Sequence, residues 1–143
     1  MFDPKEILHS AFAIKKAYDS IWNSVMEKYS LTRAEIDVLA FLKCNPNHDT
    51  SRDIVEYKMT AKSHVSKAVE NLMSRGYIIR IQDEDDKRVI HLKLTEESDS
   101  AVAEIKSIQA DFAEKISDGI TPEERAAFHS IAKKLCINAE KML

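Results

Sequence analysis

The side chains best suited to chemistry in this 143-residue chain gather in two neighbouring stretches. The first stretch offers ammonium, hydroxyl, imidazole and amide groups, which hydrogen-bond phosphate oxygens and base edges. Its members are Lys62, Ser63, His64, Ser66, Lys67 and Asn71. The second stretch, residues 82–88, has no apolar residue and ends in Lys87-Arg88. This chemistry is typical of contact with a polyanion and requires elements that present both stretches on one face.

The first stretch has the pattern of a short amphipathic helix from Thr60 to Arg75. Thr60 is a plausible N-cap, because its hydroxyl can accept a hydrogen bond from a free N–H of the first turn. Val65, Ala68, Val69 and Leu72 recur at helical spacing. The polar residues fall on the opposite side, and Gly76 supplies the left-handed position that ends a helix. The pattern predicts a recognition helix; an ordinary solvated amphipathic helix has the same pattern.

Two β-rich runs follow and predict a hairpin with a protruding tip. Residues 77–81 are rich in β-branched side chains, and residues 89–95 alternate between apolar and polar. Four consecutive acids, Asp83 to Asp86, precede the basic pair and would repel phosphate if they all faced it. We expect Asp86 to hold Arg88 by a carboxylate–guanidinium pair, so that Arg88 enters a minor groove. The alternative is a loop whose charges only interact with solvent.

The remaining elements read as helices with local start signals. Thr32-Arg33-Ala34-Glu35 and Thr121-Pro122-Glu123-Glu124 are capping boxes, and Asp3-Pro4 opens the first helix. Thr50 or Ser51 caps a short helix in which we expect Ile54, Val55 and Met59 to be buried. Core residues are expected at Ile36, Val38, Leu39, Phe41 and Leu42, and a further helix follows a cap at Thr95.

The terminal helices carry more apolar surface than one small domain readily covers. An apolar seam of about three heptads comprises Ile7, Ala11, Ile14, Tyr18, Ile21 and Val25. The last helix places Phe128, Ile131, Leu135 and Met142 on one face. Two interpretations are open: these helices pair with a second copy of the chain, or they pack against one another within a monomer, since a heptad seam fixes neither partner nor copy number.

The chain resembles the multiple antibiotic resistance regulator (MarR) family. The resemblance rests on Leu72 to Ile78 with Arg80, on the acidic wing ending in Asp86-Lys87-Arg88, and on Leu92-Lys93-Leu94-Thr95. Leu31-Thr32 also matches the start of that family's second helix. Two positions depart from the pattern: Val55 replaces the usual alanine, and Lys87 replaces the commoner arginine, which keeps the charge but loses the planar fork.

The resemblance implies a mostly α fold with a small β-hairpin. It implies one domain, 1–143, in which residues 30–95 form a winged helix-turn-helix lobe and residues 1–29 and 96–143 form a helical dimerisation lobe. The implied function is that of a DNA-binding transcriptional regulator, a homodimer on a palindromic operator. It also implies a small aromatic or amphipathic ligand between the lobes. Four aromatic side chains could line that site, although aromatic residues at helical spacing usually belong to a core: Phe12, Tyr18, Trp22 and Tyr29.

Composition excludes several other classes of protein. With 44% hydrophobic and 31% charged residues, the composition is that of a globular protein. No apolar run indicates a membrane span and no leader pattern indicates secretion. We therefore expect a cytoplasmic location. With two glycines, the chain has no glycine-rich phosphate loop, and we expect neither an enzyme nor a cofactor or metal site. Cys44 and Cys136 are expected to be reduced core thiols.

Charge leaves a second class of function open. The net charge is −3, although residues 51–95 carry nine basic and seven acidic side chains, so the excess of positive charge lies where phosphate would be met. An acidic wing and a negative chain also suit a winged-helix module that binds a protein, or a sensor that does not itself contact DNA. The sequence does not decide between repressor and activator.

Overall fold

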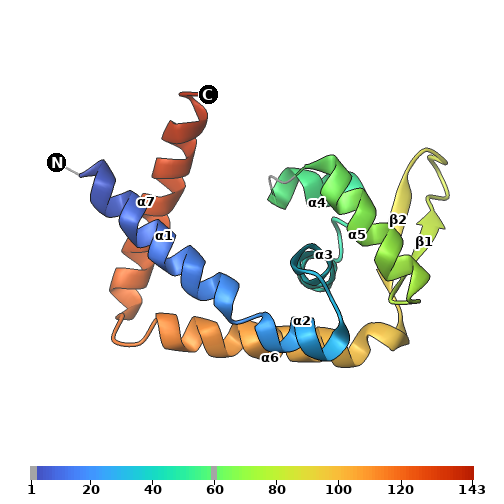
Figure 1. Cartoon of the computed structure of the whole chain (residues 1–143). Helices are drawn as coiled ribbons and strands as arrows, with labels where there is room; N and C mark the ends of the chain where they lie inside the picture. Colours follow the sequence, from blue (N-terminus) through green and yellow to red (C-terminus); the bar gives the residue numbers. More distant parts are fainter. Residues whose placement is uncertain (1–2, 59–60) are drawn as a thin grey trace. The chain divides into compact units, whose positions relative to one another are not determined.

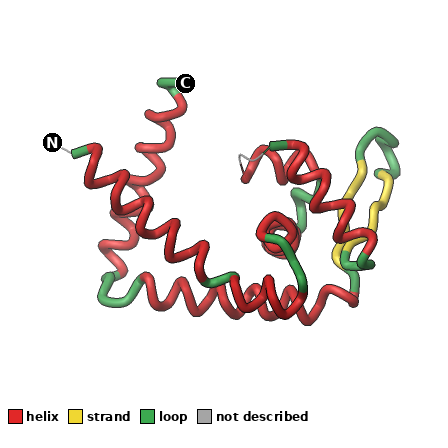
Figure 2. The backbone as a smooth tube through the Cα atoms, viewed as in Figure 1, coloured by secondary structure: helices red, strands yellow, loops and turns green. Residues whose placement is uncertain are grey.

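The computed structural model describes residues 3–58 and 61–143, and most of them are helical (Figure 1). In chain order the elements are α1 (Pro4–Ser20), α2 (Asn23–Tyr29), α3 (Arg33–Cys44), α4 (Ser51–Lys58), α5 (Lys62–Ser74), β1 (Ile78–Gln82), β2 (Ile90–Leu94), the 3-10 turn η1 (Glu96–Ser98), α6 (Asp99–Ile116) and α7 (Pro122–Glu140). The predicted fold class, a mostly α chain with one small hairpin, is confirmed (Figure 2). Among the described helices, none is long and apolar enough to cross a membrane.

The described residues form two compact units, Met1–Ala110 and Asp111–Leu143. The first unit holds the predicted winged helix-turn-helix lobe, residues 30–95, together with α1, α2 and most of α6. The second unit holds the end of α6 and α7. The predicted lobe made from 1–29 and 96–143 therefore draws on both units and stays a prediction.

Side-chain caps begin the helices that the sequence marked most clearly. In α3 and α7 the capping boxes at Thr32 and Thr121 are both formed. At α4 the two candidates are resolved in favour of Thr50: its hydroxyl accepts from the Asp53 N–H at 3.1 Å, and the Asp53 carboxylate accepts from the Thr50 N–H. These bonds satisfy N–H groups that have no partner inside the helix.

The recognition helix α5 begins later than predicted. Its N-cap is Ala61, which has no side-chain oxygen to cap the first turn. Thr60, the predicted cap, and Met59, a predicted core residue, lie outside the described residues. The end of α5 agrees with the prediction: Gly76 has φ +74°, and the N–H groups of Gly76 and Tyr77 donate to the carbonyls of Met73 and Leu72. Glycine accepts this left-handed backbone without a Cβ penalty.

The core of the first unit lies where α3, α4, α5 and the hairpin meet. The four apolar residues predicted for α5 and the five predicted for α3 are all buried, as is Ile54 of α4, whereas Val55 is half-buried. Strands β1 and β2 pair antiparallel with Arg80 opposite Leu92. The N–H of Leu92 also donates to the Asp49 carbonyl at 2.7 Å, which attaches the loop before α4 to the hairpin.

Two predictions about the terminal helices and cysteines need correction. The apolar seam does not run along one continuous helix, because α1 ends at Ser20 and α2 begins at Asn23. Cys44 and Cys136 are exposed free thiols, not core residues. Cys44 is the last residue of α3, beyond its buried stretch, and Cys136 lies on α7, which buries no residue.

Candidate nucleic-acid interface

The polar face of α5 is solvent-accessible along the whole helix. All six predicted side chains on α5 are exposed, and so are Lys87 and Arg88 of the wing, by which we mean β1, β2 and the wing loop 83–89. Lys62 and Ser66 border α4, whereas His64, Lys67 and Asn71 border the start of α3. The structure thus distributes the α5 residues over both flanks of one outward-facing surface, as a helix inserted into a groove requires.

Asn71 differs from the other five because its amide already has a partner. Its Nδ2 donates to Oε1 of Glu35 at 3.0 Å, and Oε2 of Glu35 accepts from the Thr32 N–H at 3.0 Å. Glu35 is only 4% exposed. The Glu35 carboxylate therefore joins the cap of α3 to the recognition helix, and Asn71 contributes to the crossing of α3 and α5 whether or not it also reaches DNA.

The wing presents a guanidinium group that is both held and exposed. Nε and Nη2 of Arg88 donate to the two oxygens of Asp86, each at 3.1 Å, and the Arg88 backbone N–H donates to the same carboxylate. The side chain of Arg88 is nevertheless 91% exposed. Hydrogen bonds from the Arg88 side chain and then its backbone hold the pKa of Asp86 below its usual value. The pair expected from the sequence is thus present, and the remaining guanidinium N–H groups stay available to another acceptor.

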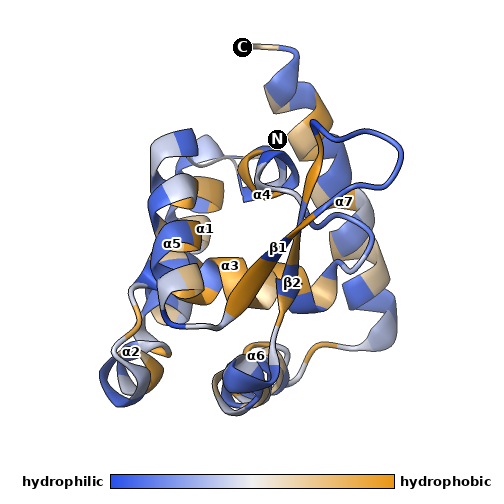
Figure 3. Cartoon of the chain, turned by 90° about the vertical axis from the view of Figure 1, so that its right-hand side faces the viewer, coloured by the Kyte–Doolittle hydropathy of each residue, from blue (hydrophilic) through white to orange (hydrophobic). Residues whose placement is uncertain are grey.

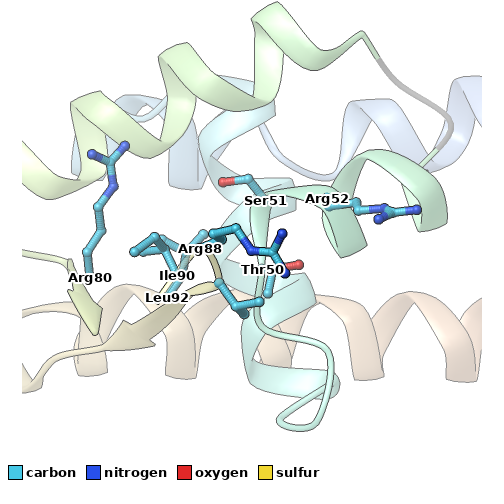
Figure 4. A pocket seen from close by; sticks show the side chains of 8 residues that line it. Thr50, Ser51, Arg52, Arg80, Arg88, Ile90 and Leu92 are labelled. Carbon is cyan, nitrogen blue, oxygen red and sulfur yellow. The ribbon is translucent and has the colours of Figure 1, made fainter. Parts of the chain in front are cut away.

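A hollow between the wing and α4 is lined in part by Arg52 and Arg80, which the sequence analysis did not select as DNA contacts (Figure 4). It measures about 420 Å³ and is lined by Arg80 and Arg88 from the hairpin, by Thr50, Ser51 and Arg52 from the start of α4, and by apolar side chains including Ile90. Nε of Arg52 donates to Glu56, one turn further along α4, at 2.9 Å. The sequence signal that was overlooked is Arg80: in a strand, a basic residue between two isoleucines faces away from them.

The wing also contains an aspartate–histidine–aspartate cluster that the sequence analysis missed. Nδ1 of His91 lies 2.5 Å from Oδ1 of Asp49, and Nε2 lies 2.7 Å from Oδ1 of Asp83. The two carboxylates lie on opposite ring nitrogens and do not converge on one point. Among the described residues, no group of His, Cys, Asp and Glu could hold a metal ion. Asp49 and His91 are 42 residues apart, so no local sequence pattern links them.

The other end of α5 is fixed by an arginine. Arg75 donates to the backbone carbonyls of Ser30 and Tyr29 at 3.0 and 2.5 Å, and its guanidinium lies over the Tyr77 ring. These carbonyls belong to the turn between α2 and α3. Arg75, which matched the family pattern in the sequence, therefore ties the end of the recognition helix to the helices before it.

The four aromatic residues considered for a ligand site lie in different environments. Trp22 is 1% exposed within the core and meets Tyr18 edge to face, while the Arg33 guanidinium lies over both rings. The Tyr29 hydroxyl donates to Glu104 at 2.9 Å. Phe12 is 66% exposed on α1. Trp22 therefore has the structural role that aromatic residues at helical spacing usually have, and the ligand site stays a prediction.

A helix pair followed by a two-stranded wing, with a polar recognition helix and an exposed wing arginine, defines a winged helix-turn-helix protein of the kind that regulates transcription. Known proteins lead to the same class. The sequence model described as MarR family matches residues 29–89. The HTH-type transcriptional repressor MdtR of Bacillus subtilis is 31% identical over 115 residues, which cover 80% of this chain and 74% of MdtR.

Two solved structures share the fold. Streptococcus pneumoniae FabT in complex with DNA is 23% identical, with a TM-score of 0.75 and coverage of 99% of this chain and 100% of FabT. Bordetella bronchiseptica BpsR, in a structure concerned with regulation of its DNA binding by 6-hydroxynicotinic acid, is 21% identical, with a TM-score of 0.70 and coverage of 92% and 98%. The chain belongs to the MarR family of transcriptional regulators. These relatives confirm the prediction of a regulator rather than an enzyme.

Proposed function

We propose that this protein is a homodimer that binds a palindromic DNA operator through α5 and the wing of each subunit. The observation that carries the proposal is the Asp86–Arg88 pair, which holds a guanidinium at the wing loop while leaving it 91% exposed. In this arrangement α5 lies in a major groove and Arg88 enters the neighbouring minor groove. Two-fold symmetry then places the half-sites about one turn, roughly 34–36 Å, apart.

The acidic wing loop is compatible with this proposal because half of its carboxylates are already used internally. Asp83 accepts from His91 and from the N–H groups of Asp85 and Asp86, and Asp86 accepts from Arg88. Two of the four consecutive acids therefore shape the loop and hold its cation. Figure 3 shows how hydrophilic the wing loop is compared with the strands that carry it.

Homodimerisation is supported by the apolar side chains that the terminal helices expose. Leu8 and Phe12 on α1 are 69% and 66% exposed, and α7 exposes Phe128, Ile131 and Leu135. Covering such surface is favourable by about 25 cal/mol for each Å² removed from water. A second copy carries the same surfaces and is the partner that a two-fold symmetric operator requires.

We further propose that a small aromatic or amphipathic ligand modulates DNA binding. The support is the fold shared with BpsR, whose DNA binding is regulated by 6-hydroxynicotinic acid. A ligand can do this only if it binds one arrangement of the two recognition helices better than another. Such a regulator acts in the cytoplasm, where its DNA is.

Selection from random double-stranded DNA by gel shift, at low and at moderate salt, tests the proposal. We expect enrichment of one palindrome and steep loss of binding as salt rises, because phosphate contacts release counterions. Weak binding without enrichment would instead favour a winged-helix module that binds a protein partner. Thermal-shift measurements with small aromatic acids test the ligand separately, with stabilisation as the expected result.

A further inference from the structure

The ring of His91 lies between two carboxylates, close to the end of the hairpin that carries the wing loop. Asp49 comes from the loop before α4, and Asp83 opens the wing loop. An ionised carboxylate only accepts hydrogen bonds, so both ring nitrogens of His91 must donate. This is satisfied only by the doubly protonated, positively charged imidazolium.

The surroundings of the ring favour that charge. Hydrogen bonds with Asp49 and then Asp83 raise the pKa of His91 above its ordinary value of 6.5. Burial raises the pKa of Asp49, but hydrogen bonds from His91 and Lys93 bring it below the ordinary value. Lys93, on the same strand as His91, lies 2.5 Å from the second Asp49 oxygen. The residue opposite His91 on β1 is Ile81, which carries no charge.

Asp83 carries the connection from His91 into the wing loop. Its Oδ2 accepts from the backbone N–H groups of Asp85 and Asp86, at 3.0 and 2.9 Å, and this fixes the turn of the loop. Asp86 in turn holds Arg88. A continuous series of hydrogen bonds and one short stretch of backbone therefore joins the buried Asp49 to the exposed Arg88.

The other end of this series is anchored firmly. Asp49 is 7% exposed, and its carbonyl accepts from the Leu92 N–H at 2.7 Å. The next residue, Thr50, caps α4. His91 consequently connects the exposed Arg88 of the wing to the loop from which α4 begins.

We infer that His91 is a positioning residue of the wing, and that the charged form of its ring holds the wing loop, and with it Arg88, in the arrangement that binds DNA. This inference rests on the proposed function. Loss of one ring proton would leave a nitrogen lone pair facing a carboxylate, and the more exposed contact, with Asp83, would open. The wing loop would then lose the group that orients its turn.

The expected dependence on pH has a definite sign. The pKa of His91 in the folded protein is raised, so the contact is fully present below the ordinary value of 6.5 and is lost as pH rises through the raised value. DNA affinity should accordingly fall as pH rises through the raised pKa of His91, in addition to any general salt effect. The decrease should be about fivefold, at the low end of typical coupling between sites.

Two variants separate charge from shape. His91→Arg keeps a planar cation that can donate to two carboxylates but does not titrate in this range, so binding should persist and its pH dependence should disappear. His91→Gln lacks the charge, so its binding should be weaker than that of the wild type by about fivefold at the acidic end of the titration and should not vary with pH. His48→Gln makes the same chemical change on the exposed loop before α4 and should keep the wild-type profile.

The first measurement is fluorescence anisotropy of the full chain with a labelled random-sequence duplex at low salt, between about pH 6 and pH 9. A pH profile that is unchanged in both His91→Arg and His91→Gln would overturn the inference. Absence of binding by the wild-type protein at every pH would contradict the proposed function instead.

A measurement without DNA distinguishes failure of the inference about His91 from failure of the proposed DNA-binding function. NMR of the free protein follows the His91 ring and the backbone amides of Asp85 and Asp86 through the same titration. We expect all three to change with one midpoint above 6.5. Amides that do not respond when the His91 ring titrates, or a ring that titrates below that value, would overturn the positioning role whatever the protein binds.

Discussion

Helices α5 and α7 both carry apolar residues at helical spacing, but the environments of those residues differ. In α5, Val65, Ala68, Val69 and Leu72 are all buried against the rest of the first unit. In α7 no residue is buried, and Phe128 is 66% exposed. The apolar face of α5 is thus covered by its own chain, and that of α7 is not. The difference supports the proposal that α7 contributes to an interface with a second copy of the chain, whereas the apolar face of α5 is already covered within one chain.

The largest expected effect comes from placing a charge on α7. Phe128→Asp should weaken dimer formation by about a hundredfold or more, because a carboxylate without a partner is costly to bury. Sedimentation equilibrium measures this dissociation constant. The matched control is His129→Asp, next to it on the same helix and outside the apolar face. Equal dissociation by both variants, or by neither, would contradict the assignment of this face as an interface.

A second substitution tests the covered helix. Leu72→Ala should lower the free energy of unfolding by about 2–5 kcal/mol, since it removes a fully buried side chain and leaves a cavity. Urea denaturation of the full chain measures the loss. Phe12→Ala, which truncates a side chain that is 66% exposed on α1, should lower the free energy of unfolding of the unassociated chain much less. A small effect of Leu72→Ala would show that the α5 core is less well packed than the structure describes.

Arg88→Ala tests the wing directly. Operator affinity should fall by about tenfold or more, because a charge-assisted contact is lost, while the dimer stays intact. Titration of the selected duplex by anisotropy, with sedimentation as the check on assembly, gives the result. Lys43→Ala, at the end of α3, removes a similar charge away from the interface and serves as control. Unchanged affinity in Arg88→Ala would remove the wing from the binding surface.

The smallest effect is expected at Lys67. If its ammonium contacts a phosphate, Lys67→Ala should reduce the slope of log affinity against log salt by about one unit. Affinity measured over a salt series gives this slope. Relaxed preference at one base pair, with the slope unchanged, would instead mean that Lys67 contacts a base.

Features whose interacting residues lie close together in the sequence could be predicted, whereas contacts between residues far apart in the sequence could not. The capping boxes at Thr32 and Thr121 and the left-handed Gly76 lie within single turns of chain, and the structure contains them all. The start of α5 was placed too early because Ala61 caps the helix without a side-chain signal. The Asp86–Arg88 pair could be anticipated because its partners are two residues apart.

The remaining polar contacts of the site depend on tertiary structure. Asn71 with Glu35, and Asp49 with His91, are separated by 36 and 42 residues, so only the fold brings them together. The cysteines were misjudged for a related reason: cysteine is usually buried, but its exposure here follows from the end of α3 and from an uncovered α7. Residue type alone does not indicate which face of an element is covered.

Sedimentation velocity of the protein mixed with its selected duplex tests the central claim most directly. The account predicts two protein chains on each duplex, bound in one cooperative step, with dissociation as salt is raised. A complex with one chain per duplex, or no complex at low salt, would contradict a dimeric regulator that reads a palindrome through α5 and the wing.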